Sequence, residues 1–201
     1  MAIKRVVPPL LVVLLMGLVP VPGAAQEAET EADCRRALQE TARAYKQGRQ
    51  PEASTEQLAR ECSTPVRSET IASEDVPANE GVVTTSSVGS GCRTIRDGRA
   101  LYNGFGQEII YFVGTLRWCF NRGWTTGGSF DLNVRSCCFW YFEGNVLSEN
   151  RGCFNGCTFV SRYRLGSFIF NPPWPTLTTR VQPWFRLRGN GDGTAVHSSG
   201  N

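Results

Sequence analysis

The stretch from residue 108 to residue 142 constrains the fold of this chain more than any other part of its sequence. Apolar and polar residues alternate through it in two long runs, and the stretch as a whole holds three of the five tryptophans and three of the eight cysteines. Successive side chains of a strand point to opposite faces of a sheet, so each run predicts a strand with one apolar face. The apolar faces carry Ile110, Phe112, Leu116, Trp118 and Phe120 in the first run, and Phe130, Leu132, Val134, Cys138, Trp140 and Phe142 in the second. The opposite faces carry Tyr111, Thr115, Arg117 and Cys119, and then Asp131, Asn133, Arg135, Cys137 and Tyr141.

Turn residues and further alternating runs extend this pattern over residues 92–198. Turns are predicted at Asn103-Gly104, at residues 121–123 and 143–145, and at Asn155-Gly156. The strand after the last turn puts Phe159, Tyr163, Leu165 and Ile169 inward, and Arg162 and Arg164 outward. A last long strand has Leu177, Thr179, Val181, Phe185 and Leu187 on one side, and Arg180, Trp184, Arg186 and Arg188 on the other. Residues 189–193 are either a loop into a short final strand or the start of a frayed tail. The pattern predicts a mainly β fold, an antiparallel β-sandwich or a small barrel.

Residues 26–64 predict a different unit, an acidic α-helical hairpin. Thr30 is a candidate N-cap of the first helix, Gly48 a natural end, and Ser54 the start of a capping box for a short second helix. Cys34 lies at the start of the first helix and Cys62 at the end of the second. An antiparallel hairpin brings these ends together, so we predict a Cys34–Cys62 disulfide that stabilises a unit too small to bury much apolar surface.

The segment of residues 65–91 joins the two units. It is rich in Pro, Ser, Thr, Glu and Gly, which predicts a flexible linker. Residues 26–81 contain 12 acidic and 7 basic residues, a net charge of −5, whereas residues 82–201 contain 6 acidic and 12 basic residues, a net charge of +6. The alternative to a linker is therefore an acidic strap that lies across the basic half.

The first 25 residues have the pattern of an export signal. Lys4 and Arg5 precede an apolar run, and small residues at positions 23–25 predict cleavage after Ala25. The alternative is an uncleaved anchor, but the run is shorter than the ~20 apolar residues that a spanning helix needs. The sequence thus predicts a secreted, extracellular protein without a transmembrane segment after cleavage.

Eight cysteines in an exported chain of this size indicate four disulfides. Apart from the hairpin pair, the cysteines are Cys92, Cys119, Cys137, Cys138, Cys153 and Cys157. Cys119 and Cys137 fall on the same predicted face and are plausible partners. The remaining pairings stay open, because adjacent cysteines in a regular strand point to opposite faces and a bulge would reverse the assignment.

Catalytic and metal chemistry finds little support in the sequence. The cysteines lack the close pairs of a zinc site. The single histidine, His197, lies near the C-terminus without a nearby carboxylate, which favours a solvated tail residue over a catalytic base. A glycosidase needs two carboxylates at a set distance, and nothing singles out a pair among the six in the β half. No metal or cofactor is predicted, and an enzyme is the less favoured interpretation.

Arginine and aromatic residues on the predicted outer faces give the one functional hypothesis. The candidate binding residues are Arg117, Arg135, Arg162, Arg164, Arg180, Trp184, Arg186 and Arg188. Such a surface binds anionic glycans or cell-wall polymers, whereas nucleic acid is a poor candidate for an exported protein. The leading prediction is a secreted, non-catalytic binding protein. The alternatives are a secreted polysaccharide hydrolase, a bacteriocin-like antagonistic factor, or an ordinary solvated sheet face.

Three short features over residues 92–198 resemble small secreted proteins of actinobacteria. They are the pair Trp118-Cys119, the turn at residues 121–123, and the turn at residues 191–194. The resemblance implies a secreted β-sandwich. It implies no active site, so no functional residue is transferred to this chain.

Overall fold

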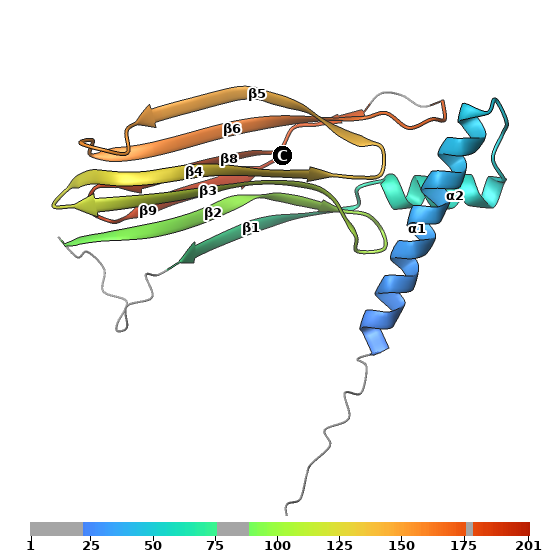
Figure 1. Ribbon diagram of the computed structural model, residues 1–201, viewed down its shortest axis with the longest axis horizontal. Coiled ribbons are helices and arrows are strands. Elements are labelled where there is room, and N and C mark those ends of the chain that lie inside the picture. The colour runs from blue at the N-terminus through green and yellow to red at the C-terminus, as the bar shows by residue number, and fades with distance from the viewer. Residues whose placement is uncertain (1–21, 76–88, 176–178) are drawn as a thin grey trace, which may run out of the picture.

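The computed structural model describes residues 22–75, 89–175 and 179–201 of the chain. Two antiparallel sheets pack face to face as a β-sandwich, and two helices lie at one end of the strands (Figure 1). The first sheet has the strand order β1-β2-β3-β4, and the second the order β5-β6-β8-β9 with β7 paired to β6. The predicted mainly β fold, preceded by two helices, is confirmed. Of the predicted export signal, residues 1–21 lie outside the described residues.

The first sheet is built from consecutive antiparallel strands. Its strands are β1 (Arg67–Asp75), β2 (Ser90–Tyr102), β3 (Glu108–Asn121) and β4 (Trp124–Ser136). The predicted turn at Asn103 is present, and its side-chain oxygen accepts hydrogen bonds from the amides of Phe105 and Gln107 at 3.0 and 2.9 Å. The predicted apolar face of β3 is confirmed, because Phe112, Leu116 and Trp118 are fully buried between the sheets.

The second sheet departs from the predicted boundaries. Its strands are β5 (Trp140–Gly152), β6 (Phe159–Phe170), β7 (Thr179–Val181), β8 (Trp184–Asn190) and β9 (Ala195–Gly200). The turn predicted at residues 143–145 is wrong: β5 continues through it with irregular pairing on either side of Asn145. The predicted last long strand is two strands, since Pro183 has no amide hydrogen to continue the ladder. Of the two alternatives for the C-terminal residues, the short final strand is correct.

The face of β6 that packs on the first sheet is the opposite of the prediction. Val160, Arg164 and Phe168 lie on the buried side, whereas Tyr163 faces outward. The two faces of β6 have a similar apolar content. Placing Arg162 and Arg164 toward solvent therefore selects the wrong face. The correct face contains Gly166, where a β-carbon would lie 2.7 Å from the Phe112 ring. A glycine at this point lets the aromatic ring of the opposite sheet approach the β6 backbone.

The helices form the predicted hairpin with different starting points. α1 (Pro22–Lys46) begins before the predicted N-cap Thr30, and α2 (Ala53–Ser63) begins before Ser54, with Glu52 at its N-cap and no side-chain cap bond. Cys34 and Cys62 form the predicted disulfide, with their Cα atoms 5.6 Å apart. The predicted Cys34–Cys62 disulfide is therefore confirmed, whereas the N-caps predicted at Thr30 and Ser54 are wrong.

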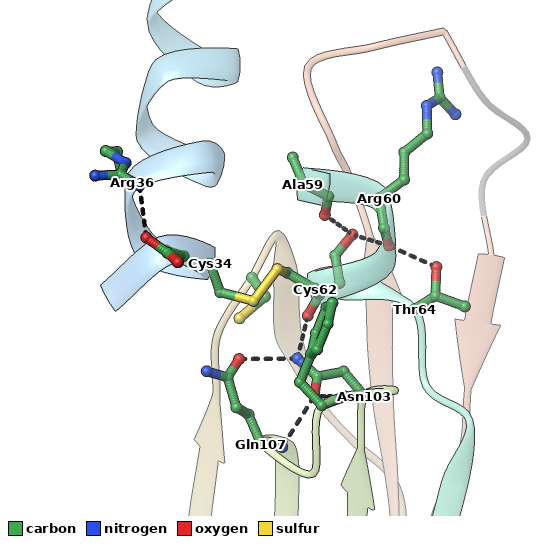
Figure 2. The surroundings of a disulfide bond; sticks show 12 residues. Cys34, Arg36, Ala59, Arg60, Cys62, Thr64, Asn103 and Gln107 are labelled. Carbon is green, nitrogen blue, oxygen red and sulfur yellow. Dashed lines mark hydrogen bonds and ion pairs between the residues drawn. A yellow bond between two sulfur atoms is a disulfide. The ribbon is translucent and has the colours of Figure 1, made fainter. Parts of the chain in front are cut away.

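The helical hairpin packs on the end of the sandwich. Trp174 is buried against Ala37 and Ala59, and the Arg60 guanidinium lies 5.0 Å from the centre of its ring. The Asn103 amide nitrogen donates to the Cys62 carbonyl at 2.9 Å (Figure 2). These contacts attach the two units directly through α2.

The flexible linker predicted for residues 65–91 is wrong where the structure describes it. Arg67–Asp75 is β1 and pairs with β2 along its whole length, and β2 already begins at Ser90. The polar composition that suggested a linker is that of an edge strand, where charged residues discourage pairing with other chains. The linker and strap alternatives for residues 76–88 lie outside the described residues.

The disulfides of the β domain differ from the prediction. Cys119 bonds to Cys92, its direct cross-strand neighbour, and not to Cys137. Cys137 and Cys138 bond to each other, because they lie in a turn between β4 and β5 where the alternation of a strand does not apply. Cys153 and Cys157 close the connection between β5 and β6.

Removing the hairpin disulfide should destabilise both helices, because it is the covalent link between α1 and α2. In a variant with Cys34→Ala and Cys62→Ala, we expect the local unfolding free energy of α1 and α2 to fall by about 3 kcal/mol, the value for closing a loop of this length. Hydrogen exchange measured by peptide would show faster exchange in both helices. Exchange in β3 serves as the internal control, and an equal change there would contradict an effect confined to the hairpin.

Candidate functional site

The eight predicted binding residues lie in three separate places. Arg117 and Arg135 lie on the outer face of the first sheet, and Arg162 and Arg164 point between the sheets. The remaining four lie on the outer face of the second sheet, where Leu187 and Phe185 mark the opposite, buried side; they are Arg180, Trp184, Arg186 and Arg188. The structure therefore brings half of the set together.

The two arginines of β6 act in the packing of the sheets. The Arg164 guanidinium lies 4.7 Å from the ring centre of Phe130 and donates to the carbonyl of Glu149 and the side chain of Asn150. Arg162 lies 4.7 Å from the Phe154 ring. Burial lowers the pKa of both guanidinium groups. Their apolar stems cover core surface while their charged ends stay hydrogen-bonded or stacked, which corrects their predicted outward position.

On the outer face of the first sheet, charged and aromatic side chains bind one another. Arg135 forms an ion pair with Glu108 at 3.0 Å and lies 4.2 Å from the ring centre of Tyr111. Burial raises the pKa of Glu108, and Arg135 opposes that effect. Tyr111 is buried, because Ile71 of β1 and neighbouring side chains form a second apolar cluster there. The sequence pattern does not predict this cluster, because the polar composition of β1 indicates a linker.

The outer face of the second sheet carries a ladder of guanidinium groups over aromatic rings. Arg186 lies 5.3 Å from the ring centre of Tyr163, and Arg188 lies 4.4 Å from that of Phe159. The Tyr163 and Trp184 rings are 6.2 Å apart. We call these five residues the Arg/aromatic ladder. Each arginine of β8 is thus held in place by an aromatic ring of the neighbouring strand β6, which fixes where its donors point.

A small groove of about 160 Å³ lies along this ladder. It is lined by Glu149, Arg151, Phe159, Ser161, Tyr163, Arg186 and Arg188. Arg151 pairs with Glu149 at 2.9 Å. Within the described ranges no carboxylate lies within ion-pair distance of Arg186 or Arg188, so the groove keeps a net positive charge.

Arg180 differs from its neighbours on the same face. It forms two hydrogen bonds with the Glu143 carboxylate, at 2.9 and 3.2 Å. A hydrogen bond from Ser167 has the largest effect in lowering the pKa of Glu143, and the hydrogen bond from Arg180 lowers it further. Because its guanidinium is already bound to a carboxylate, Arg180 is a weaker candidate for ligand binding than Arg186 and Arg188.

His197 does not lie in a solvated tail, which corrects the prediction. It belongs to β9, and its Nδ1 lies 2.7 Å from the Oδ2 atom of Asp97 in β2. Asp97 is 1% exposed, and its other oxygen accepts a hydrogen bond from the amide of Gly98 at 2.6 Å. The pair connects the two sheets along the edge where β9 faces β2. The two partners lie 100 residues apart on separate strands, so no local sequence motif marks the pair.

Several of the six carboxylates counted in residues 82–201 are bound by different partners. Glu108 pairs with Arg135, Glu143 with Arg180, and Asp192 accepts from Thr194. No group of three or more His, Cys, Asp or Glu side chains suited to a metal ion occurs in the parts of the chain that the structure describes. No helix within the described ranges is long and apolar enough to cross a membrane.

Comparison with known proteins adds no assignment: no family model matches this chain, and the curated proteins and solved structures give no significant match. The resemblance to small secreted actinobacterial proteins therefore stays a prediction.

Proposed function

We propose that this chain is a secreted, non-catalytic protein that binds an anionic glycan or cell-wall polymer through the Arg/aromatic ladder. The observation that carries the proposal is the pair Arg186 and Arg188, stacked over Tyr163 and Phe159 and not neutralised by a carboxylate of the described chain. Export is supported by four disulfides, which persist in oxidising compartments, and by the signal-like N-terminus.

The spacing of the ladder suits a linear ligand. Alternate residues of a strand are separated by about 6.6 Å, so Arg186 and Arg188 present two charges in a row along β8. A guanidinium group binds a carboxylate, sulfate or phosphate through two parallel hydrogen bonds. The adjacent Trp184 and Tyr163 rings offer apolar surface with a polar edge, which suits a sugar ring next to the charged group. The groove lies on the outer face of the sheet, which fits a polymer that lies across the strands.

The proposal predicts loss of polymer binding when the ladder is removed. In a variant with Arg186→Ala and Arg188→Ala, we expect retention on immobilised polygalacturonate or teichoic acid to weaken at least about tenfold, because two charge-assisted contacts are lost. The wild type should also bind less at high salt, where exposed charges are screened. Retention on both columns is compared with retention on neutral dextran.

The control is Arg117→Ala, which removes an exposed arginine from the opposite face of the sandwich. It should bind like the wild type. Binding to polygalacturonate alone identifies carboxylate recognition, and binding to teichoic acid alone identifies phosphate recognition. Equal retention of the wild type and the double variant on every column would refute the Arg/aromatic ladder as the binding surface.

A further inference from the structure

The turn of residues 137–139 lies at a large cleft between the helices and the sandwich. The cleft has a volume of about 1020 Å³, and its walls include Cys34 and Leu38 of α1, Phe105, and both Cys137 and Cys138. Cys137 is exposed, and Cys138 is partly exposed. The Cys137–Cys138 disulfide is therefore open to a small molecule in solution. By contrast, Cys34 and Cys62 are 2% and 0% exposed.

The backbone of this turn adopts an unfavourable conformation. Cys138 has φ 61° and Phe139 has φ 69°. The left-handed region is uncommon for residues with a side chain, and two such residues in succession persist only where the surroundings hold them. The bond between neighbouring cysteines closes a small ring around their shared peptide, which restricts the backbone at this point. Opening that ring would let the turn relax.

The same turn holds the helical hairpin on the sandwich. The Phe139 ring meets the Trp174 ring edge-on, with centroids 5.3 Å apart, and Trp174 is the residue on which the helices pack. The next residue, Trp140, donates its indole N–H to the carbonyl of Ser63 at the end of α2, at 2.8 Å. The position of both aromatic side chains depends on the turn, so a change in the turn reaches the hairpin directly.

We propose that Cys137–Cys138 is a thiol–disulfide exchange site for a small dithiol, and that its reduction releases the helical hairpin. A thiolate of the dithiol attacks the exposed Cys137 sulfur, the bond between the two cysteine sulfurs breaks, and Cys138 leaves as a thiolate that takes up a proton. The second thiol of the reagent then attacks the mixed disulfide and frees Cys137. Two electrons and two protons pass to the cysteines, and the dithiol becomes a cyclic disulfide.

The first test measures the order of reduction. The full chain is treated with increasing dithiothreitol, free thiols are alkylated, and the labelled peptides are identified by mass spectrometry. We expect Cys137 and Cys138 to be labelled at roughly tenfold lower reductant than Cys34 and Cys62, because exposed and conformationally unfavourable disulfides are the labile ones. Reduction of Cys34–Cys62 first, or of both pairs together, would overturn the proposal.

The second test measures the coupling to the hairpin. At the dithiothreitol concentration that reduces only Cys137–Cys138, hydrogen exchange in α2 should rise at least about tenfold. A variant with Cys137→Ala and Cys138→Ala should show this faster exchange without reductant. The matched control is Cys153→Ala with Cys157→Ala, which opens a short disulfide loop between β5 and β6 and should leave α2 unchanged. Unchanged α2 exchange after selective reduction of the wild type would overturn the release of the hairpin.

Discussion

Replacing Trp118 with alanine is expected to lower the free energy of unfolding by about 4 kcal/mol, the largest loss for a single side chain of the core. The indole is fully buried, and its N–H donates to the Asn190 carbonyl at 3.0 Å. Its ring lies on Gly189, where a β-carbon would be 2.3 Å away. The substitution leaves a cavity between β3 and β8 and removes the partner of a buried carbonyl, and neither is easily repaired.

Urea unfolding followed by circular dichroism measures this loss. The control is Trp124→Ala, the same substitution at a residue that is 53% exposed at the start of β4. Its expected effect is below about 1 kcal/mol, as for most surface changes. Similar losses for the two variants would contradict the assignment of Trp118 to the core and of Trp124 to the surface.

The inner face of β3 could be predicted because only one of its faces is continuously apolar up to the strand end. β6 lacks such a pattern, because both of its faces contain aromatic and aliphatic residues. The correct choice depends on Phe112 of the opposite sheet, which requires Gly166 beneath its ring. Long arginine side chains can also cover a core while their charged ends find partners at its edge. Neither fact is visible in a single strand.

The disulfides show a related limit. Cys34–Cys62 follows from the local geometry of a hairpin, so the sequence was sufficient for it. Cys92–Cys119 depends on the register between β2 and β3, and β2 begins in a segment whose polar composition indicated a linker. Cys137–Cys138 depends on a turn with two left-handed residues, neither of which is glycine. The usual turn signals do not mark such a place.

The candidate site was predicted in part for a simple reason. Trp184, Arg186 and Arg188 alternate with the buried residues Phe185 and Leu187, so their shared outer face follows from the period of the strand. Their aromatic partners, Tyr163 and Phe159, were assigned to the core because the face of β6 was inverted. The stacked arrangement therefore became visible only in the assembled sheet.

His197→Ala is expected to lower the free energy of unfolding by about 3 kcal/mol, because it leaves the Oδ2 atom of the buried Asp97 without its hydrogen-bond partner. In the described chain that carboxylate would keep only the hydrogen bond from the Gly98 amide. His197 is itself partly exposed, with 26% of its side chain accessible. In an Asp97→Ala variant, water can therefore hydrogen-bond to the His197 ring in place of the missing carboxylate. For this reason Asp97→Ala should lower the free energy of unfolding less than His197→Ala.

A second substitution separates this electrostatic effect from a loss of packing. Adding Asp97→Asn to the His197→Ala variant replaces a buried charge with a neutral amide of the same shape, and should recover about half of the lost free energy. Ser198→Ala, an exposed neighbour on β9, is the control and should be close to neutral. All variants are compared by urea unfolding at neutral pH. If Asp97→Asn recovers nothing, the contribution of His197 is its contact surface between β9 and β2, and the buried carboxylate is not what makes its removal costly.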